Sequence, residues 1–494
     1  MAFPVISATE AAQYIKNGDN IGLSGFTACG TPKAVTEALA EIATKEHAEG
    51  RDFKVSLFTG ASTNDHVDGA LGRANAIDKR APYQSTTDSR KGINARNINY
   101  FDLHLSEMAQ KLRYGFYGPM NIGIIEVADI DDNGDAVLGT GVGMSPTVAM
   151  MADKIIIERN HEVSPRMRGV HDLVLPLDPP YRREIGIYKA SDRIGSPVLH
   201  IDPAKIVGIV ETNAKDGAKT FTAPDEVSQR IAANVCDLLA SDLRAGRIPK
   251  EFLPLQSGVG NVANAVLFGL AERDDIPAFE MYTEVVQDAV VGLMESGKCK
   301  FASACSMSFS DEMMDHVFAN MDFFHDRIVL RPGEISNSPE VVRRLGIIAM
   351  NTALEADIFG NVNSTHVTGT KMMNGIGGSG DFTRNSYLSI FSCPSITKGG
   401  AISNIVPMVS HVDHSEHSVD IIITDQGIAD LRGKSPIQRA HEIIEHCAHP
   451  DYRPLLRDYL ARGANAHTPH SLCNAFAFHE AFIETGDMRN AKFV

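Results

Sequence analysis

The stretch Ile21-Gly-Leu-Ser-Gly-Phe-Thr-Ala-Cys-Gly-Thr-Pro-Lys-Ala-Val-Thr-Glu-Ala-Leu39 joins a short apolar strand to a helix through a glycine turn. The same design returns in Leu253-Pro-Leu-Gln-Ser-Gly-Val-Gly-Asn-Val-Ala-Asn-Ala-Val-Leu-Phe-Gly-Leu270. Both stretches have Ser-Gly at the turn, and the apolar residues after it follow helical spacing. A strand followed by a helix is the building unit of α/β folds.

Two further pairs of segments recur in the same order along the chain. Ile125-Glu-Val-Ala-Asp-Ile-Asp-Asp-Asn-Gly134 matches Leu354-Glu-Ala-Asp-Ile-Phe-Gly-Asn361, and Ala152-Asp-Lys-Ile-Ile-Ile-Glu158 matches Val419-Asp-Ile-Ile-Ile-Thr-Asp425. The last two are β-branched runs, which are typical of buried central strands. Three matches in order predict an internal duplication, and therefore an α/β fold with two similar open-sheet α/β domains.

The proline-marked stretch from Val174 to Thr222 is predicted to connect the two domains. We therefore expect an N-terminal domain at residues 1–220 and a C-terminal domain, carrying the candidate nucleophile described below, at residues 221–494. A length of 494 residues allows two or three domains. The net charge of −16 makes a nucleic-acid partner unexpected, because phosphate binding needs a basic face.

The cysteine pattern favours a reducing compartment. The seven cysteines include no pair with Cys-x-x-Cys spacing, so we expect reduced thiols and a cytoplasmic location. The first residues, Met-Ala-Phe-Pro-Val, do not combine a basic region with an apolar run, so no signal peptide is predicted. No apolar run approaches the roughly 20 residues of a membrane helix, and no membrane partner is expected.

Glu284 is a candidate nucleophile. Residues 276–282 are predicted to form a strand, and the apolar spacing from 286 to 294 predicts a helix. Glu284 is therefore expected where the carboxyl end of a strand meets a helix, and open α/β sheets bind ligands at such ends. The alternative is a first-turn acid that complements the helix dipole, with Thr283 as N-cap.

The loop Gly375-Ile-Gly-Gly-Ser-Gly-Asp-Phe382 allows three interpretations. Its Gly-x-Gly-x-x-Gly spacing suggests a dinucleotide site, but such a site opens a helix, whereas strand-like alternation follows here from Tyr387 to Phe391. The loop is otherwise a plain turn or a set of N–H donors for a developing oxyanion, which must lie about 2.7–3.1 Å from that oxygen. The sequence does not rank these last two.

A second glycine loop and one amide are further candidates. Gly258-Val-Gly-Asn-Val-Ala263 precedes a predicted helix, whose N-terminal N–H groups attract anions, although a tight turn for close packing explains it equally well. Asn337 precedes Ser338-Pro339, a good N-cap and first helical residue, and is expected to be a turn residue unless its amide is recruited elsewhere.

The histidines of His411-Val-Asp-His414-Ser-Glu-His417 raise the question of a metal site. Their spacing suits a shared helix face only in a helical segment, and the surrounding residues lack a helical pattern. A solvated loop is the favoured interpretation, and no metal is predicted.

At these residues the chain resembles the acetyl-CoA hydrolase/transferase family of class I CoA-transferases, over nearly its whole length. The matching segments are Ser24-Gly-Phe-Thr27, Ser257-Gly-Val-Gly-Asn261, Tyr282-Thr-Glu284, Leu354-Glu-Ala-Asp-Ile-Phe-Gly-Asn-Val-Asn363, Gly375-Ile-Gly-Gly-Ser-Gly-Asp-Phe382 and Ala429-Asp-Leu-Arg-Gly433. The resemblance implies the CoA-transferase fold with two α/β domains and an active site between them. One departure is Thr424-Asp425, where family members commonly have Thr-Glu, so any active-site role of Asp425 is in doubt.

The resemblance also implies roles for individual residues. Glu284 would be the nucleophile, and the Asn337 amide and the Gly378 N–H would form the oxyanion site, which holds the oxyanion that develops when Glu284 attacks the acyl-CoA thioester. Coenzyme A would contact Val259, Gly260, Asn261, Val262, Ala263, Leu354, Asn374, Gly378 and Lys398. Relatives suggest a homodimer or larger homo-oligomer.

The predicted reaction moves CoA between small carboxylic acids, such as succinyl-CoA and acetate, through a glutamyl-CoA thioester. Glu284 is expected to be ionised at neutral pH, since an unperturbed glutamate has a pKa of about 4.3. CoA is then a substrate and a transient covalent adduct, and no prosthetic group is expected. Three alternatives stay open: an acetyl-CoA hydrolase with the same nucleophile, a nucleotide-dependent enzyme that uses the glycine loops, and a catalytically inert CoA-binding protein.

Overall fold

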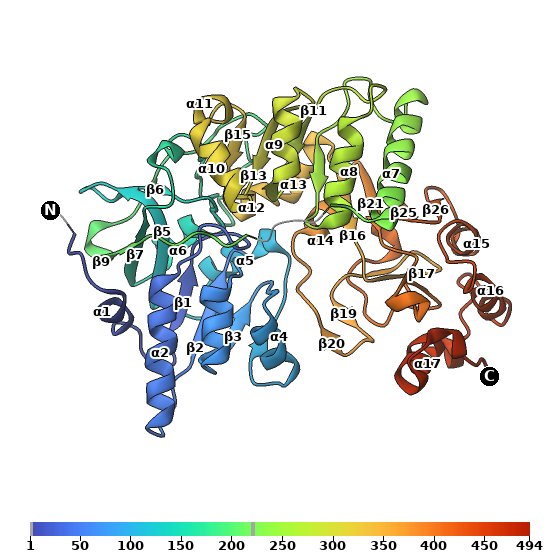
Figure 1. Cartoon of the computed structure of the whole chain (residues 1–494), viewed down its shortest axis with the longest axis horizontal. Coiled ribbons are helices and arrows are strands. Elements are labelled where there is room, and N and C mark those ends of the chain that lie inside the picture. Colours follow the sequence, from blue (N-terminus) through green and yellow to red (C-terminus); the bar gives the residue numbers. More distant parts are fainter. Residues whose placement is uncertain (1–2, 219–222) are drawn as a thin grey trace.

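The computed structural model describes residues 3–218 and 223–494, which fold around two open sheets (Figure 1). The first is a nine-stranded sheet with a parallel central part and an antiparallel extension. Its parallel strands lie in the order β4 (Asn99–Tyr100), β3 (Ile77–Ala81), β2 (Val55–Thr59), β1 (Asn20–Leu23), β5 (Ile122–Ile130), β7 (Lys154–Asn160) and β9 (Ile206–Thr212). The extension consists of β6 (Asp135–Leu138) and β8 (Leu199–His200).

The second sheet is eight-stranded and has one antiparallel edge strand, β26 (Gly427–Asp430). Its parallel strands lie in the order β15 (Ile328–Leu330), β13 (Cys299–Ala304), β11 (Phe279–Tyr282), β10 (Leu255–Ser257), β16 (Ile348–Thr352), β21 (Leu388–Ser392) and β25 (Ile421–Thr424). Short strands form small additional sheets: β12 (Val285–Gln287) with β14 (Ser306–Ser308), β17 (Glu355–Asp357) with β18 (Val362–Asn363) and β24 (Ile405–Val406), β19 (His366–Val367) with β20 (Lys371–Met372), and β22 (Ile396–Thr397) with β23 (Ile402–Ser403).

The two sheets confirm the predicted duplication, because their parallel strands follow the same order both in space and along the chain. β4-β3-β2-β1-β5-β7-β9 corresponds to β15-β13-β11-β10-β16-β21-β25. The first repeated segment falls on the equivalent strands β1 and β10, and the second lies in β5 and directly after β16. The third pairing was wrong: β7 corresponds to β21, and β25 occupies the place of β9. The pairing failed because β7 and β25 both contain a run of isoleucines, and such a run is common to buried strands and does not identify their position in the sheet.

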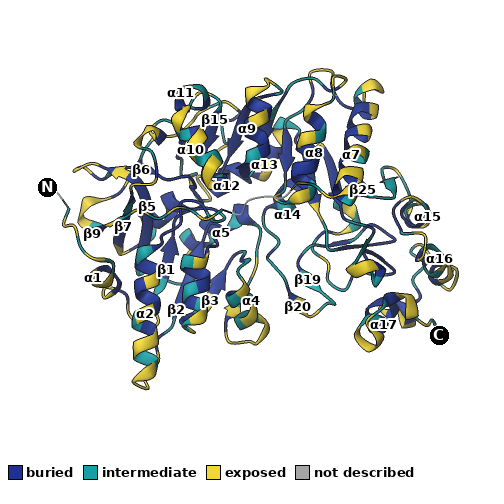
Figure 2. Cartoon of the chain, in the orientation of Figure 1, coloured by how far each residue is buried: buried dark blue, intermediate teal, exposed yellow. Residues whose placement is uncertain are grey.

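Helices connect and cover the strands. They are α1 (Ala8–Ala12), α2 (Ala34–Ala48), α3 (Ala70–Arg73), α4 (Thr87–Asn94), α5 (Leu105–Arg113), α6 (Ser145–Met151), α7 (Glu226–Arg244), α8 (Asn261–Ala271), α9 (Asp288–Glu295), α10 (Asp311–Ala319), α11 (Met321–Phe324), α12 (Gly333–Ser336), α13 (Pro339–Leu345), α14 (Ser379–Asn385), α15 (Pro436–His446), α16 (Arg453–Ala461) and α17 (Ala477–Thr485). Figure 2 shows buried residues along the strands and exposed residues on the outer faces of helices such as α2. None of the described helices combines the length and apolar character that crossing a membrane requires.

The predicted connecting segment is only partly irregular. Within Val174 to Thr222 the chain forms β8 and then β9, which pairs in parallel with β7 and belongs to the first sheet. The β-branched run in Ile206–Thr212 outweighs the proline signals that precede it. The boundary near residue 220 lies outside the described residues, so the division into 1–220 and 221–494 stays a prediction.

The two halves share an interface built from backbone hydrogen bonds and apolar side chains. The N–H of Val142 donates to the carbonyl of Cys305 at 3.0 Å, and the N–H of Met307 donates to that of Thr140 at 2.9 Å. One cluster of buried apolar side chains includes Phe26 and other residues of the first half together with residues of the second. This interface brings the carboxyl ends of the two parallel sheets close to each other.

Candidate active site

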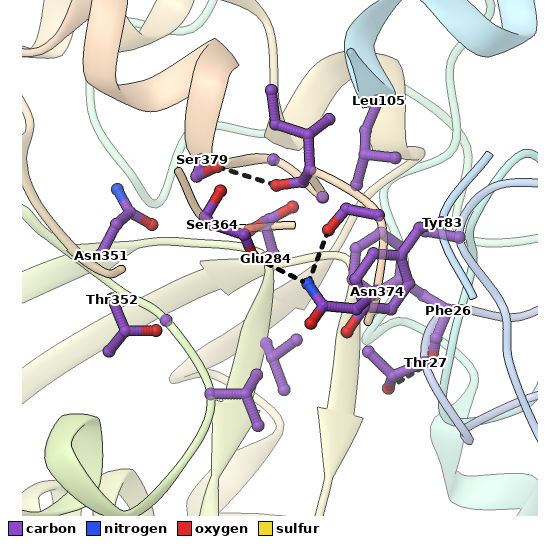
Figure 3. Close-up of a pocket in the computed structure, with 18 of the residues that line it drawn as sticks. Phe26, Thr27, Tyr83, Leu105, Glu284, Asn351, Thr352, Ser364, Asn374 and Ser379 are labelled. Atoms are coloured by element: carbon purple, nitrogen blue, oxygen red, sulfur yellow. Dashed lines mark hydrogen bonds between the residues drawn. The ribbon is translucent and has the colours of Figure 1, made fainter. Parts of the chain in front are cut away.

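A cavity of about 220 Å³ lies between the carboxyl ends of the two sheets. We call it the Glu284 cavity (Figure 3). Its wall consists of segments that follow β1, β2, β3, β10, β11 and β16, together with the N-terminus of α14. The lining residues are Phe26, Thr27, Ala61, Tyr83, Leu105, Gly258, Val259, Glu284, Val285, Asn351, Thr352, Ala353, Leu354, Ser364, Asn374, Gly375, Ile376, Gly377, Gly378 and Ser379. Ligand sites of open α/β sheets occur at these strand ends.

Glu284 lies in this cavity between β11 and β12. Its backbone carbonyl accepts hydrogen bonds from the N–H groups of Cys305 at 2.8 Å and Ser306 at 3.1 Å, which fix the backbone. The alternative role as a first-turn helix acid was wrong, because α9 begins only at Asp288. Thr283 is not its N-cap, since its hydroxyl bonds to the Ser257 carbonyl at 3.2 Å.

Asn337 is recruited to the glutamate. It is fully buried at the end of α12, directly before α13, which starts at Pro339 as predicted. Its Nδ2 donates to Oε1 of Glu284 at 2.9 Å, and its Oδ1 accepts from the Ser336 hydroxyl at 2.9 Å. Because the Ser336 hydroxyl donates to the amide oxygen of Asn337, the amide nitrogen is left to face the Glu284 carboxylate.

Gly378 is the second donor to Glu284, through its backbone N–H. A Cβ at this position would lie 2.0 Å from Oε1 of Glu284 and 2.2 Å from Nδ2 of Asn337, so only glycine allows this approach. Contrary to the prediction, the glycine loop does open a helix, since Gly378 is the N-cap of α14. The preceding strand β20, however, pairs only with β19 in an antiparallel hairpin, which is not the context of a dinucleotide site.

The carboxyl group of Glu284 is harder to ionise than the sequence suggested. Burial raises its pKa to about 7, although the hydrogen bonds from Asn337 and Gly378 favour the ionised form. The expectation of an ionised Glu284 at neutral pH used the pKa of a solvated glutamate and did not include this effect of burial. A carboxyl group with a perturbed pKa in a cleft is a frequent sign of a functional site.

The first turn of α14 is held from both halves. Asp381 accepts hydrogen bonds from the N–H of Ser106 at 3.0 Å and from its hydroxyl at 2.5 Å, and burial raises the pKa of Asp381 to about 7. The Ser379 hydroxyl lies 3.1 Å from Nε2 of His414. These residues set the position of the Gly378 N–H, and the sequence did not reveal them. An acid three residues after a glycine N-cap is the signal that could have identified Asp381.

The residues predicted to contact CoA are only partly in the cavity wall. Val259, Leu354 and Asn374 line it with Gly378, whereas Gly260, Asn261, Val262 and Ala263 continue from the wall into the start of α8. Lys398 is exposed and does not line the cavity; its Nζ lies 4.9 Å from the ring centre of Phe482. The hairpin that carries Lys398 is joined to the cavity wall where the amide of Asn404 donates to the Leu354 carbonyl at 2.7 Å.

Asp425 and the histidine group lie apart from Glu284. Asp425 accepts from the N–H of Ser395 at 2.6 Å and from its hydroxyl at 3.0 Å, so it fixes a turn and does not line the cavity. His414 is buried against Phe391, which contradicts the predicted solvated loop at this position, while His417 is exposed. Across residues 3–218 and 223–494, no group of three or more His, Cys, Asp or Glu side chains is placed to hold a metal ion.

Known proteins share this sequence and fold. Residues 3–211 match the family model of the acetyl-CoA hydrolase/transferase N-terminal domain, and residues 314–460 match that of the C-terminal domain. A propanoyl-CoA:succinate CoA transferase of Escherichia coli is 50% identical, covering 98% of both chains. A succinyl-CoA:acetate CoA-transferase of Clostridium kluyveri is 47% identical, covering 98% of this chain and 90% of that one.

A hydrolase and a solved structure extend the comparison. An acetyl-CoA hydrolase of Schizosaccharomyces pombe is 44% identical, covering 98% of this chain and 96% of that one. The crystal structure of RipA from Yersinia pestis has the same fold, with a TM-score of 0.71, 23% identity, and coverage of 92% of this chain and 96% of that chain. The two matched domains and the similar full-length relatives show that the chain belongs to the acetyl-CoA hydrolase/transferase family, and the strand order agrees with this.

Proposed function

We propose that this enzyme is an acyl-CoA:carboxylate CoA-transferase that works through a glutamyl-CoA thioester on Glu284. The observation that carries the proposal is that Glu284 and Gly378 line one cavity at the sheet ends, with the Asn337 amide and the Gly378 N–H both donating to the Glu284 carboxylate. A carboxylate with two fixed donors suits covalent acyl transfer. The cavity, at about 220 Å³, suits a small acyl group.

The proposed reaction proceeds by ping-pong exchange. The Glu284 carboxylate attacks the thioester carbonyl of an acyl-CoA and expels CoA thiolate, leaving an acyl–glutamyl anhydride. The thiolate then attacks the glutamyl carbonyl and releases the acyl group as a free carboxylate. A second carboxylate reverses both steps and leaves as the new acyl-CoA. The electron pairs balance without a general base, because only the ionised form of Glu284 reacts.

The position of the two donors refines this scheme. Asn337 and Gly378 donate to Glu284 itself, so we assign them to the oxyanion that forms on the glutamyl carbonyl when the thiolate attacks. The initial expectation assigned them to the oxyanion of the acyl thioester. Because donors placed before the reaction need no reorganisation, they lower the barrier for forming and consuming glutamyl-CoA.

A comparison of the two halves supports CoA binding at the start of α8. In the first half, the Glu158 carboxylate accepts from the N–H groups of Lys33 at 2.6 Å, Ala34 at 3.0 Å and Val35 at 3.1 Å, and so occupies the N-terminus of α2. In the second half, the equivalent helix α8 begins at Asn261 beside the Glu284 cavity, and its N-cap is Gly260, which has no side chain. A helix N-terminus attracts anions such as the phosphates of CoA.

An acetyl-CoA hydrolase with the same nucleophile is the second candidate. It is favoured by the 44% identity to the S. pombe hydrolase, whereas higher identity to two transferases favours exchange. We further propose that CoA is a substrate and that the enzyme has no prosthetic group. The other substrates are small carboxylates. The protein is proposed to be a homo-oligomer in the cytoplasm. A nucleotide-dependent enzyme is disfavoured by the hairpin that precedes the Gly375 loop.

A pair of glutamine variants tests the proposal. Glu284→Gln removes the nucleophile and is expected to abolish exchange between an acyl-CoA and a labelled acid. The control is Glu280→Gln, which should retain exchange. Glu280 lies four residues earlier, in β11, and its side chain is not part of the cavity wall. Lasting full activity of Glu284→Gln, with deamidation excluded by mass, would contradict the proposal.

A further inference from the structure

A second cavity lies next to the Glu284 cavity. It has a volume of about 520 Å³, and its polar lining includes Asp102, His104, His366, His411 and Asp413. We call it the histidine cavity. Exposed residues also line it, so it reaches the surface; these are Asn94, Arg96 and Thr370. A polar cavity of this size holds water.

The two cavities share a short piece of wall. Asn374 and Ile376 line both, and they carry the only side chains of the segment Asn374-Gly-Ile-Gly-Gly378. Asn374 is turned into its own loop, because its Nδ2 donates to the carbonyls of Ser364 at 3.3 Å and Gly375 at 2.9 Å. Ile376 is therefore the apolar side chain that the linings of the two cavities share.

The first half of the chain holds this wall in place. The N–H of Ile376 donates to the Asp102 carboxylate at 2.5 Å, and Asp102 also accepts from the N–H of Leu103 at 3.1 Å. A Cβ at Gly375 would lie 2.5 Å from the Tyr100 hydroxyl, so the loop backbone lies directly against this segment. The position of Ile376 is thus set by a contact between the two halves.

We propose that Ile376 is a barrier against water, and that it makes transfer outcompete hydrolysis. This inference rests on the proposed function, since it concerns the fate of glutamyl-CoA. When water reaches the thioester, its oxygen bonds to the glutamyl carbonyl, the C–S bond breaks, and the water proton goes to the leaving thiolate. The products are free CoA thiol and the Glu284 carboxylic acid, so the CoA is lost to hydrolysis. Removing an apolar barrier from an active site admits this side reaction.

The test measures two rates for each purified variant: CoA exchange with an acceptor acid, and release of CoA thiol without one. Ile376→Ala should raise the ratio of hydrolysis to exchange several-fold, and Ile376→Val should raise it less. Asp102→Asn, which weakens the anchor of the Ile376 N–H, should raise the ratio without shortening the barrier side chain and serves as a second route if Ile376→Ala folds poorly.

An alanine control enlarges the histidine cavity without opening the wall. Leu103→Ala changes only that cavity and should keep the wild-type ratio. The barrier proposal is overturned if the wild type exchanges CoA but the ratio of hydrolysis to exchange is unchanged in both Ile376→Ala and Asp102→Asn. It is also overturned if this ratio rises equally in all variants. A wild-type protein without any exchange instead defeats the proposed function itself.

Discussion

At the scale of single residues, the chemistry depends on the environment of one carboxyl group. Glu284 is half-buried, its carboxylate accepts hydrogen bonds from Asn337 and Gly378, and its pKa is raised to about 7 by burial. Only the ionised form attacks a thioester, so the protein keeps part of its nucleophile protonated at neutral pH. A more basic carboxylate is also a better nucleophile, which compensates in part for its lower population.

The pH dependence of catalysis follows from this pKa. We expect kcat/KM for acyl-CoA to fall as the pH drops below about 7, approaching a tenfold loss per pH unit in the acid limb. Burial also raises the pKa of Asp381 to about 7, so Asp381→Asn is the control and should retain the limb. A profile that is flat between about pH 5.5 and about pH 8 would exclude Glu284 as the titrating group.

The same pKa predicts how Glu284 affects stability. The folded state binds the Glu284 proton more tightly than the unfolded state, so stability is lost as the pH rises from about 4.5 to about 7, and the full cost is present above the folded pKa. Raising the pKa from 4.5 to about 7 corresponds to about 3 kcal/mol. Glu284→Gln should therefore raise the melting temperature at about pH 8.5. The gain should vanish near pH 4, where both side chains are neutral.

The matched stability control is Glu280→Gln, which makes the same substitution at a half-buried residue of β11 outside the cavity wall, and the gain of Glu284→Gln is measured relative to it. Differential scanning calorimetry at both pH values measures the effect. A Glu284→Gln protein that is less stable than the wild type at high pH would mean that the hydrogen bonds from Asn337 and Gly378 outweigh the cost of burial.

At the scale of elements, two helix N-termini form the site. The first turn of α14 presents the Gly378 N–H to the nucleophile, and α8 begins at the mouth of the cavity with Gly260 as its N-cap. The equivalent helix of the first half, α2, is closed by the Glu158 carboxylate. The duplicated fold thus offers two similar helix starts, and the one in the second half lies beside the Glu284 cavity.

Gly260→Ala tests the role of α8. Gly260 has φ of 128°, so an alanine there introduces about 1–3 kcal/mol of backbone strain and displaces the first N–H groups of the helix. We expect the KM for acyl-CoA to rise about tenfold, with the KM for the acceptor acid unchanged. Gly246→Ala is the control, since Gly246 also has a positive φ, at 72°, but lies at the exposed end of α7. If both variants have the same KM for acyl-CoA, α8 does not contribute to the CoA site.

The sequence predicted the strands and turns better than the relations between them. The repeated Ser-Gly turns located β1 and β10, and the short run before Glu284 located β11, because both patterns are local. The helix α14 was missed, since Ser-Gly-Asp-Phe-Thr-Arg-Asn lacks strong helix formers and is stabilised by contacts with Ser106 and His414 from distant segments. The shifted pKa of Glu284 likewise depends on residues that only folding brings together.

At the scale of the whole molecule, the active site exists because two similar sheets meet. Arg113 of α5 forms an ion pair across this meeting point, to Glu334 at 2.8 Å, and a second ion pair within the first half, to Asp178 at 2.9 Å. The Arg113 and Glu334 side chains are 2% and 4% exposed, and Glu334 lies in α12, three residues before Asn337. The contact between the halves therefore supports the segment that orients the Asn337 amide.

Breaking this ion pair should destabilise the protein strongly. Arg113→Met leaves the buried Glu334 carboxylate without its partner, which costs about 3–5 kcal/mol. The double variant Arg113→Met/Glu334→Gln removes the unpaired charge and should recover much of the loss. Urea denaturation of both variants checks this. A single variant as stable as the wild type would show that the contact does not hold the halves together.

The central claim is that CoA becomes covalently attached to Glu284 during turnover. Mass spectrometry of peptides, after brief incubation with acyl-CoA and no acceptor acid, measures this most directly. The account predicts a CoA thioester on the peptide that contains Glu284, lost on adding a carboxylate acceptor. An adduct on another residue, or none at all while the enzyme exchanges CoA, would contradict it.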